Sequence, residues 1–137
     1  MPETIRLVNY FYVQASNKPG EGARLLTLLR DAGVNLLAVH AFPQGRRAQV
    51  DFVPSNAAAF KAAMRRAGLR VTGPKQAFII SGNDRPGALV GAFSKLAQAK
   101  INVTATSGVA AGAGRFGVIL WVKPRDVKRG AKVLGAR

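Results

Sequence analysis

Two short segments of this sequence combine residue types suited to binding a small molecule that carries one positive and one negative charge. One contains Asn17, Lys18, Pro19, Gly20 and Glu21, and the other contains Asn83, Asp84, Arg85, Pro86, Gly87 and Ala88. Each precedes an apolar pattern of helical spacing, so the free backbone N–H groups of a helix start are expected there. Those groups and the helix dipole attract a carboxylate, which gains about 0.3–1 kcal/mol. Asp84 suits an ammonium group, so the predicted chemistry is binding of an amino acid.

The same residues also have a purely structural explanation, and both explanations stay open at this point. Asparagine and aspartate are favoured N-cap residues, and proline is favoured at the first helical position. A well-capped helix start therefore accounts for Asn17 and Asp84 without any ligand.

The two segments belong to an internal repeat with an offset of 67 positions. The offset pairs Asn17 with Asp84 and Asn35 with Asn102, and it holds without a gap across the apolar positions between them. A chain of 137 residues with this period is two copies of one small module. We place the copies at residues 5–73 and 74–137.

The first copy has the pattern of alternating strands and helices that must position these segments. The alternation puts Phe11 and Val13 on one face of a strand, while Tyr10 and Tyr12 share the opposite face. The expected elements are a strand at 10–14, a helix from Pro19 to about 32, strands at 36–42 and 48–53, a helix capped by Asn56, and a short edge strand at 69–72.

The second copy repeats this order but is expected to lack the last strand. Its elements are a strand at 76–81, a helix at 86–99, strands at 103–109 and 116–122, and a helix at about 124–134. The edge beside 76–81 should therefore be paired by a strand from the first copy or from another chain. The predicted fold is α+β, with two ferredoxin-like βαββαβ modules whose helices lie on one face of antiparallel sheets.

The second copy resembles an ACT domain, a regulatory amino-acid-binding module of βαββαβ topology. The resemblance lies in Asp84-Arg85-Pro86-Gly87-Ala88-Leu89, then Phe93, Leu96 and Ile101-Asn102-Val103. The first copy is similar to a more divergent member, through Asn17-Lys18-Pro19-Gly20 and Val34-Asn35-Leu36. Together they resemble a stand-alone tandem ACT protein from about Asn9 to Gly135.

The resemblance implies an effector pocket between the first loop of one domain and the second-strand start of a neighbouring domain. The implied ligand-binding residues are Asn83, Asp84, Pro86, Gly87, Ala88 and Asn102, and Asn17, Lys18, Pro19, Gly20, Glu21 and Asn35. Asn35 and Asn102 are explained equally well as turn residues. Asn17 is neutral, and Glu21 puts an acid where the effector carboxylate would lie, so one competent site is expected. There the Gly87 and Ala88 N–H groups would meet the carboxylate.

The charge of the chain supports a different class of function as an alternative. Lys and Arg number 21 against six acids, for a net charge of +15. Such an excess favours polyanions, so the alternative is a basic ferredoxin-like protein that binds RNA or DNA through its second-helix faces. The cations concerned are Lys61, Arg65, Arg66, Arg70 and Lys75, and Lys123, Arg125, Lys128, Arg129, Lys132 and Arg137. A solvated helix face explains these clusters equally well.

Several classes of site are disfavoured by what the chain lacks. There is no cysteine, and His40 is the single histidine, so neither a metal cluster nor a catalytic triad is expected. The GxGxxG match at 112–117 joins two strands and does not open a helix, which disfavours a dinucleotide site. No secretion signal or spanning apolar run is seen. We therefore expect a cytoplasmic, non-enzymatic protein without cofactor, metal or membrane partner. It would be a homodimer that binds a small amino acid and regulates an enzyme in trans.

Overall fold

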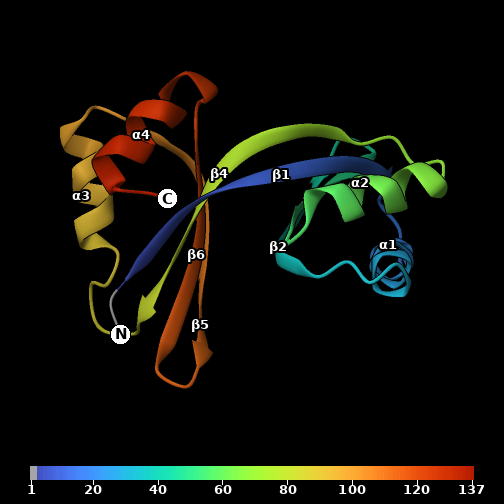
Figure 1. Cartoon of the computed structure of the whole chain (residues 1–137), viewed down its shortest axis with the longest axis horizontal. Coiled ribbons are helices and arrows are strands. Elements are labelled where there is room, and N and C mark those ends of the chain that lie inside the picture. Colours follow the sequence, from blue (N-terminus) through green and yellow to red (C-terminus); the bar gives the residue numbers. More distant parts are fainter. Residues whose placement is uncertain (1–2) are drawn as a thin grey trace. The chain divides into compact units, whose positions relative to one another are not determined.

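The structure, a computed structural model, describes residues 3–137 (Figure 1). In chain order, its elements are β1 (Thr4–Ser16), α1 (Glu21–Asp31), β2 (Leu36–Gln44), β3 (Arg47–Pro54), α2 (Ala57–Arg66), β4 (Thr72–Asn83), α3 (Val90–Gln98), β5 (Val103–Gly112), β6 (Arg115–Val122), the 3-10 helix η1 (Pro124–Asp126) and α4 (Val127–Leu134).

The chain forms two compact units, and β1 and β4 contribute to both. One unit consists of residues 9–75, and the other consists of residues 76–137 with the N-terminal segment up to Val8. Hydrogen-bonded strands follow the order β2-β3-β1-β4-β6-β5. Each unit is a ferredoxin-like, ACT-like module with an antiparallel sheet, which confirms the predicted fold class. The repeat boundaries at 5–73 and 74–137 stay a prediction, since the units follow contacts and not internal similarity.

The core of the unit at residues 9–75 lies between its sheet and its two helices. Phe11 of β1 is paired with Phe52 of β3, and both are buried. Phe60 of α2 stacks on Phe11, with ring centroids 5.1 Å apart. Leu25 and Leu29 of α1 close the same cluster. The strand alternation predicted for residues 10–14 is therefore confirmed at Phe11.

The core of the other unit uses the equivalent positions. Phe78 and Ile80 of β4 are fully buried and pack with Leu96 of α3 and Leu134 of α4. Gly130 of α4 faces the Phe78 ring closely, since a Cβ atom there would lie 3.4 Å from that ring, at the distance of an ordinary van der Waals contact. The apolar face of α4 is thereby turned inward.

The N-terminal end of β1 takes the place of the missing fourth strand in this unit. β1 is the hydrogen-bonded neighbour of β4, and Ile5 and Leu7 pack against the core. The Leu7 N–H donates to the Arg137 carbonyl at 2.9 Å, and the Arg137 N–H donates to the Ile5 carbonyl at 3.1 Å. In the described part of the chain no strand follows Leu134. The prediction that a strand of the first copy pairs this edge is confirmed.

Several predicted boundaries were wrong. The helices expected at Pro19 and Pro86 begin later, at Glu21 and Val90, because Gly20 and Gly87 have left-handed φ values of 91° and 68°. The strand expected at 69–72 is absent apart from Thr72, and the strand expected at 76–81 is longer, because β4 runs beside β1 from Thr72 to Asn83. The last helix starts as the 3-10 turn η1.

Candidate functional site

The loop of the second copy, residues 83–89, is attached to the turn between β5 and β6. The Asp84 N–H donates to the Gly114 carbonyl at 2.8 Å. A guanidinium nitrogen of Arg115 donates to Asn83 Oδ1 at 2.9 Å, and Asn83 and Arg115 are register partners of β4 and β6. No local sequence pattern predicts that Gly114 and Arg115 contact this loop. The signal that identifies them is the strand register, which places the GxGxxG turn beside this loop.

Asp84 does not cap a helix in this structure. The N-cap position of α3 is Leu89, and no side chain makes a capping hydrogen bond there. Asp84 is exposed, and within residues 3–137 its carboxylate has no hydrogen bond or ion pair. The capping explanation for this aspartate is therefore wrong.

Only one of the two predicted N–H donors in this loop is open to a ligand. The Ala88 N–H donates to the Arg85 carbonyl at 3.2 Å, so it already has an acceptor. The N–H groups of Gly87 and Leu89 have no acceptor among the residues that the structure describes. Gly87 is exposed, with a φ of 68°. The N–H groups of this loop that lack an acceptor are therefore those of Gly87 and Leu89, and the predicted contact with a ligand stays a prediction.

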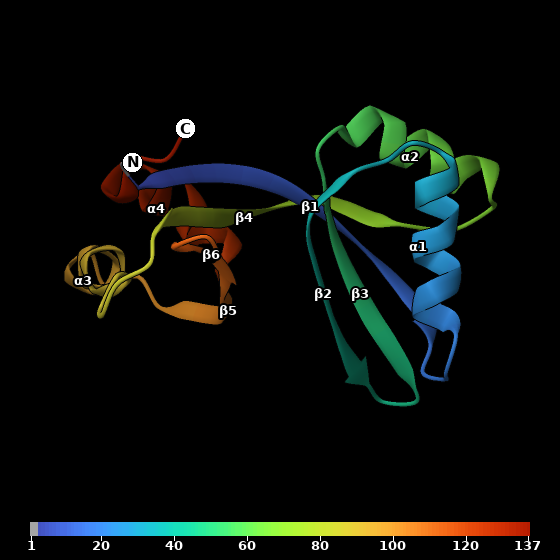
Figure 2. The same cartoon turned by 90° about the horizontal axis from the view of Figure 1, so that it is seen from below.

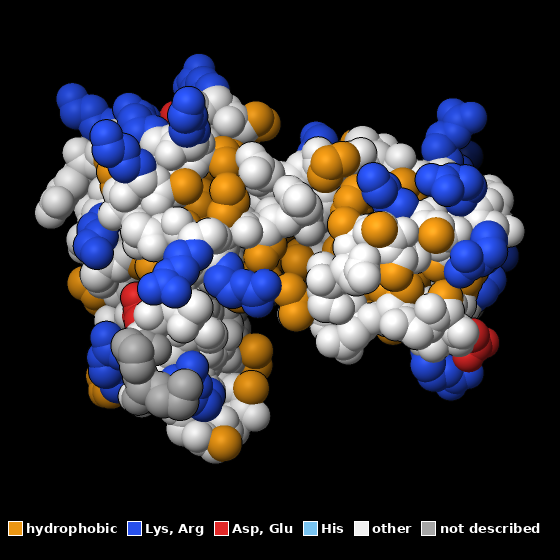
Figure 3. All heavy atoms as spheres, viewed as in Figure 1, with side chains coloured by type: hydrophobic (Ala, Val, Ile, Leu, Met, Phe, Trp, Pro, Cys, Tyr) orange, Lys and Arg blue, Asp and Glu red, His pale blue; other side chains and the backbone are white. Residues whose placement is uncertain are grey.

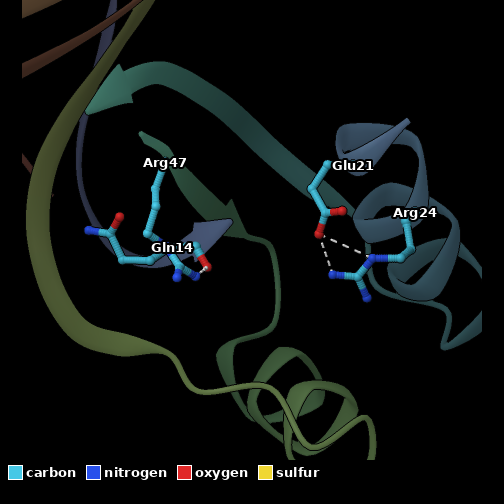
Figure 4. A network of polar contacts seen from close by, with 4 residues as sticks. All are labelled: Gln14, Glu21, Arg24 and Arg47. Carbon is cyan, nitrogen blue, oxygen red and sulfur yellow. Dashed lines mark hydrogen bonds and ion pairs between the residues drawn. The ribbon is translucent and has the colours of Figure 1, made fainter. Parts of the chain in front are cut away.

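The equivalent loop of the first copy is occupied by its own ion pair (Figure 4). Arg24 binds the Glu21 carboxylate through two guanidinium nitrogens, with Nε at 3.2 Å. The hydrogen bond from Arg24 lowers the pKa of Glu21, and the nearby charges of Arg24 and Lys18 act in the same direction. Asn17 makes no capping hydrogen bond to α1, whose N-cap is Gly20. The ion pair therefore favours the anionic form of Glu21 at the start of α1.

Polar contacts also fasten the strands beside this first loop. Arg47 donates to the Gln14 carbonyl at 3.2 Å, and Gln14 Nε2 donates to Gln44 Oε1 at 2.9 Å. Ser16 pairs with Arg47, so the β1–α1 connection lies beside the β2–β3 turn, as Figure 2 shows. In both copies the loop before the first helix thus lies next to a hairpin turn.

The two halves of the predicted pocket lie at opposite ends of a helix within each unit. Asn35 follows α1, whose 11 residues span about 16 Å at 1.5 Å per residue. Its carbonyl accepts hydrogen bonds from the Ser55 N–H at 2.9 Å and from Ser55 Oγ at 3.2 Å. Asn102 follows α3 in the same way and is exposed. A pocket that combines a loop with a strand start therefore needs two modules.

One buried acid lies outside the predicted site. Asp51 of β3 is only 5% exposed and accepts a hydrogen bond from Gln49 Nε2 at 2.9 Å. Burial raises the pKa of Asp51, although the Gln49 hydrogen bond and the charges of His40 and Lys75 oppose that shift. Its register partners are Tyr12 and His40. This polar row crosses the face of the sheet opposite the Phe11 core.

The described residues contain neither a metal-binding cluster nor a helix that could span a membrane. Residues 3–137 hold no group of three or more His, Asp or Glu side chains that are arranged to bind a metal ion. The helices within the same range are all too short or too polar to cross a membrane.

Comparisons with known proteins show what this fold is similar to. No protein-family model matches the sequence, and no curated protein matches it. A protein from Bacteroides thetaiotaomicron has a TM-score of 0.80 at 17% identity, covering 96% of this chain and 88% of that one. The regulatory subunit of aspartate kinase from Thermus thermophilus, in ligand-free form, has a TM-score of 0.64 at 15% identity, covering 98% and 95%. Clostridium acetobutylicum aspartate kinase, an allosteric enzyme, has a TM-score of 0.52 at 12% identity, covering 96% of this chain and 33% of that one.

Proposed function

We propose that this protein is a non-enzymatic regulator that binds a small amino acid between ACT-like modules and acts on an enzyme in trans. The observation that carries the proposal is the exposed, unpaired Asp84 carboxylate beside the open Gly87 N–H, in a loop held by Arg115. The fold likeness to a regulatory subunit of aspartate kinase, which extends over 98% of this chain, supports it.

The chemistry of the loop suits both charged ends of an amino acid. Asp84 receives the ammonium group, and the Gly87 and Leu89 N–H groups before α3 receive the carboxylate. Glycine at position 87 lets the ligand approach the backbone because no side chain lies in the way. Asn83, Pro86 and Ala88 shape the loop.

The second half of the pocket comes from another module, through Asn102 or Asn35. Because a loop and a strand start lie about one helix length apart within a unit, this half must come from another module. We assign it to the partner subunit of a homodimer. Light scattering at micromolar concentration should give the mass of a dimer, and a monomer mass would contradict this assembly. Binding would involve the loop at residues 83–89. At the equivalent loop, which contains Asn17, Lys18, Pro19 and Gly20, the Glu21 carboxylate repels the carboxylate of a ligand.

A thermal-shift screen of the standard amino acids tests the proposed function. A ligand that binds only the folded protein, at 100 times its Kd, stabilises it by roughly 2.7 kcal/mol. We expect a dose-dependent rise in Tm with one or a few amino acids. Because the ligand has few atoms, its Kd should lie in the micromolar to millimolar range. No rise with any amino acid up to saturating concentrations contradicts the proposal.

A further inference from the structure

A basic hollow lies on the unit formed by residues 76–137, where η1 leads into α4. Its volume is about 500 Å³, and it is lined by Arg125, Asp126, Lys128, Arg129 and Lys132. Four cations and one carboxylate give this lining a net charge of +3. Figure 3 shows Lys and Arg side chains gathered over α4. We call these five residues the basic hollow.

The packing of α4 explains why its cations share one side. Val127, Gly130 and Leu134 are buried against the core, so Lys128, Arg129 and Lys132 are left on the exposed side. Lys128 and Lys132 are four positions apart, a spacing at which like charges repel and destabilise a helix. No acid lies within α4 to offset them. A face that served only for solubility would not need this repulsion, since mixed charges also keep a surface solvated.

The internal repeat gives independent support for the basic pair. With the offset of 67 positions, Lys61 is equivalent to Lys128 and Arg65 is equivalent to Lys132. Lys61 and Arg65 are both exposed on α2, a helix that also contains no acid. The two copies have diverged at most surface positions, yet each keeps two cations at this spacing on its second helix.

We propose that the basic hollow binds phosphate groups of a nucleic-acid backbone. Arginine binds phosphate through paired N–H groups, and lysine adds point charge beside it. Asp126 holds Arg129 at 3.2 Å from one carboxylate oxygen and so limits the movement of its guanidinium. A membrane surface fits less well, because the apolar residues of α4 are buried in the core and cannot insert into lipid. The contact is to the backbone, so binding is expected with little dependence on base sequence.

The test is fluorescence anisotropy of a labelled DNA or RNA duplex against a salt series. The variant is the triple substitution Arg125→Gln, Lys128→Gln and Lys132→Gln, which keeps the Asp126–Arg129 pair. Its matched control is Arg6→Gln, Arg30→Gln and Lys95→Gln, three exposed cations elsewhere that give the same net charge. Circular dichroism and Tm show that both variants are folded.

The wild type should bind the duplex. The triple variant of the basic hollow should bind at least about tenfold more weakly near 0.1 M salt. Its slope of log K against log salt should be shallower than that of the wild type by about 3. The control variant should lose much less. Equal losses in both variants would mean bulk charge without a site and would overturn the proposal. It would also be overturned if the wild type bound anionic vesicles but no duplex.

Discussion

The guanidinium of Arg115 and the side-chain oxygen of Asn83, 2.9 Å apart, join the start of β6 to the end of β4. The backbone bond between Asp84 and Gly114, at 2.8 Å, lies directly beside them. These two bonds hold the loop that presents Asp84. The rigidity of the candidate site therefore depends on a hairpin turn that is distant in the sequence.

A double-mutant cycle on Asn83→Ala and Arg115→Met measures this attachment. Each substitution should weaken amino-acid binding, and the pair should be non-additive by about 0.5–1 kcal/mol, because the residues share one exposed hydrogen bond. Amide exchange at Asp84 should become faster in both single variants. Arg46→Met, in the β2–β3 turn of the first copy, is the control. Additive effects would mean that the bond does not fix the loop.

The substitution Asp84→Asn removes the charge that is proposed to receive the ammonium group. We expect the Kd to rise about tenfold or more, since a hydrogen bond to a charged group contributes about 1.5–3 kcal/mol. The Tm without ligand should barely change, because the Asp84 carboxylate has no partner in the described chain, and the substitution leaves the backbone bond to Gly114 in place. Isothermal titration with the amino acid measures the Kd, and melting curves measure the Tm. The control is Asp31→Asn, which makes the same charge change on α1. Unchanged affinity in Asp84→Asn would contradict the assigned role.

The substitution Gly87→Val tests whether the ligand must approach the backbone. A side chain at a φ of 68° is strained by about 1–2 kcal/mol, so some loss of stability is expected in any case. Gly68→Val has the same strain at a φ of 70°, in open space after α2. Both variants should lose stability, but Gly87→Val should also lose amino-acid binding at a temperature where both are folded. Equal heats of binding for the two variants would end the site hypothesis.

The N-terminal end of β1 should be necessary for the unit formed by residues 76–137. Ile5→Ala with Leu7→Ala removes two partly buried side chains from its core and should lower the free energy of unfolding by about 1–3 kcal/mol. The control, Thr4→Ala with Arg6→Ala, changes the side chains on the exposed face of the same strand and should lower the free energy of unfolding by less than about 0.5 kcal/mol. Urea unfolding, followed through Trp121 fluorescence, distinguishes the pairs. Similar losses in both would mean that this segment does not complete the sheet.

The buried Asp51 predicts a pH dependence of stability. Its pKa in the folded state is raised by burial, so the contribution of this group to stability is greatest below the unfolded pKa and is lost as pH rises through the folded pKa. Asp51→Asn keeps an acceptor for Gln49 and removes the buried charge. We expect a higher Tm for this variant at neutral pH, a smaller difference near pH 4, and no such change in Asp31→Asn. Melting curves over a pH series test it.

The sequence predicted the positions that depend on local periodicity. The alternation of residues 10–14 identified the buried face of β1, and the 67-residue offset identified Phe78 as the equivalent of Phe11. The helix starts were placed too early, because the proline preference for a first turn says nothing about the left-handed conformation of Gly20 and Gly87. That conformation depends on how the loop leaves the strand.

The candidate site could be predicted only in part for a similar reason. Asp84 and Gly87 stand out by their residue types, and the structure leaves both exposed. The role of Arg115 depends on the register of β4 against β6, which no local pattern reveals. The packing of Ile5 and Leu7 against the unit formed by residues 76–137 likewise depends on residues far along the chain.

The bond between Leu7 and Arg137 links residues that are separated by almost the full length of the chain. During synthesis, residues 3–8 leave the ribosome before their partners, which are β4 and the residues after α4. Contacts over such a separation form slowly, because the chain entropy lost in closing the loop precedes any gain from packing. The unit at residues 9–75 can reach its own core earlier. Folding is therefore expected to proceed in two stages, in which the unit at residues 9–75 folds first and the β1 residues before Val8 then complete the sheet of the other unit.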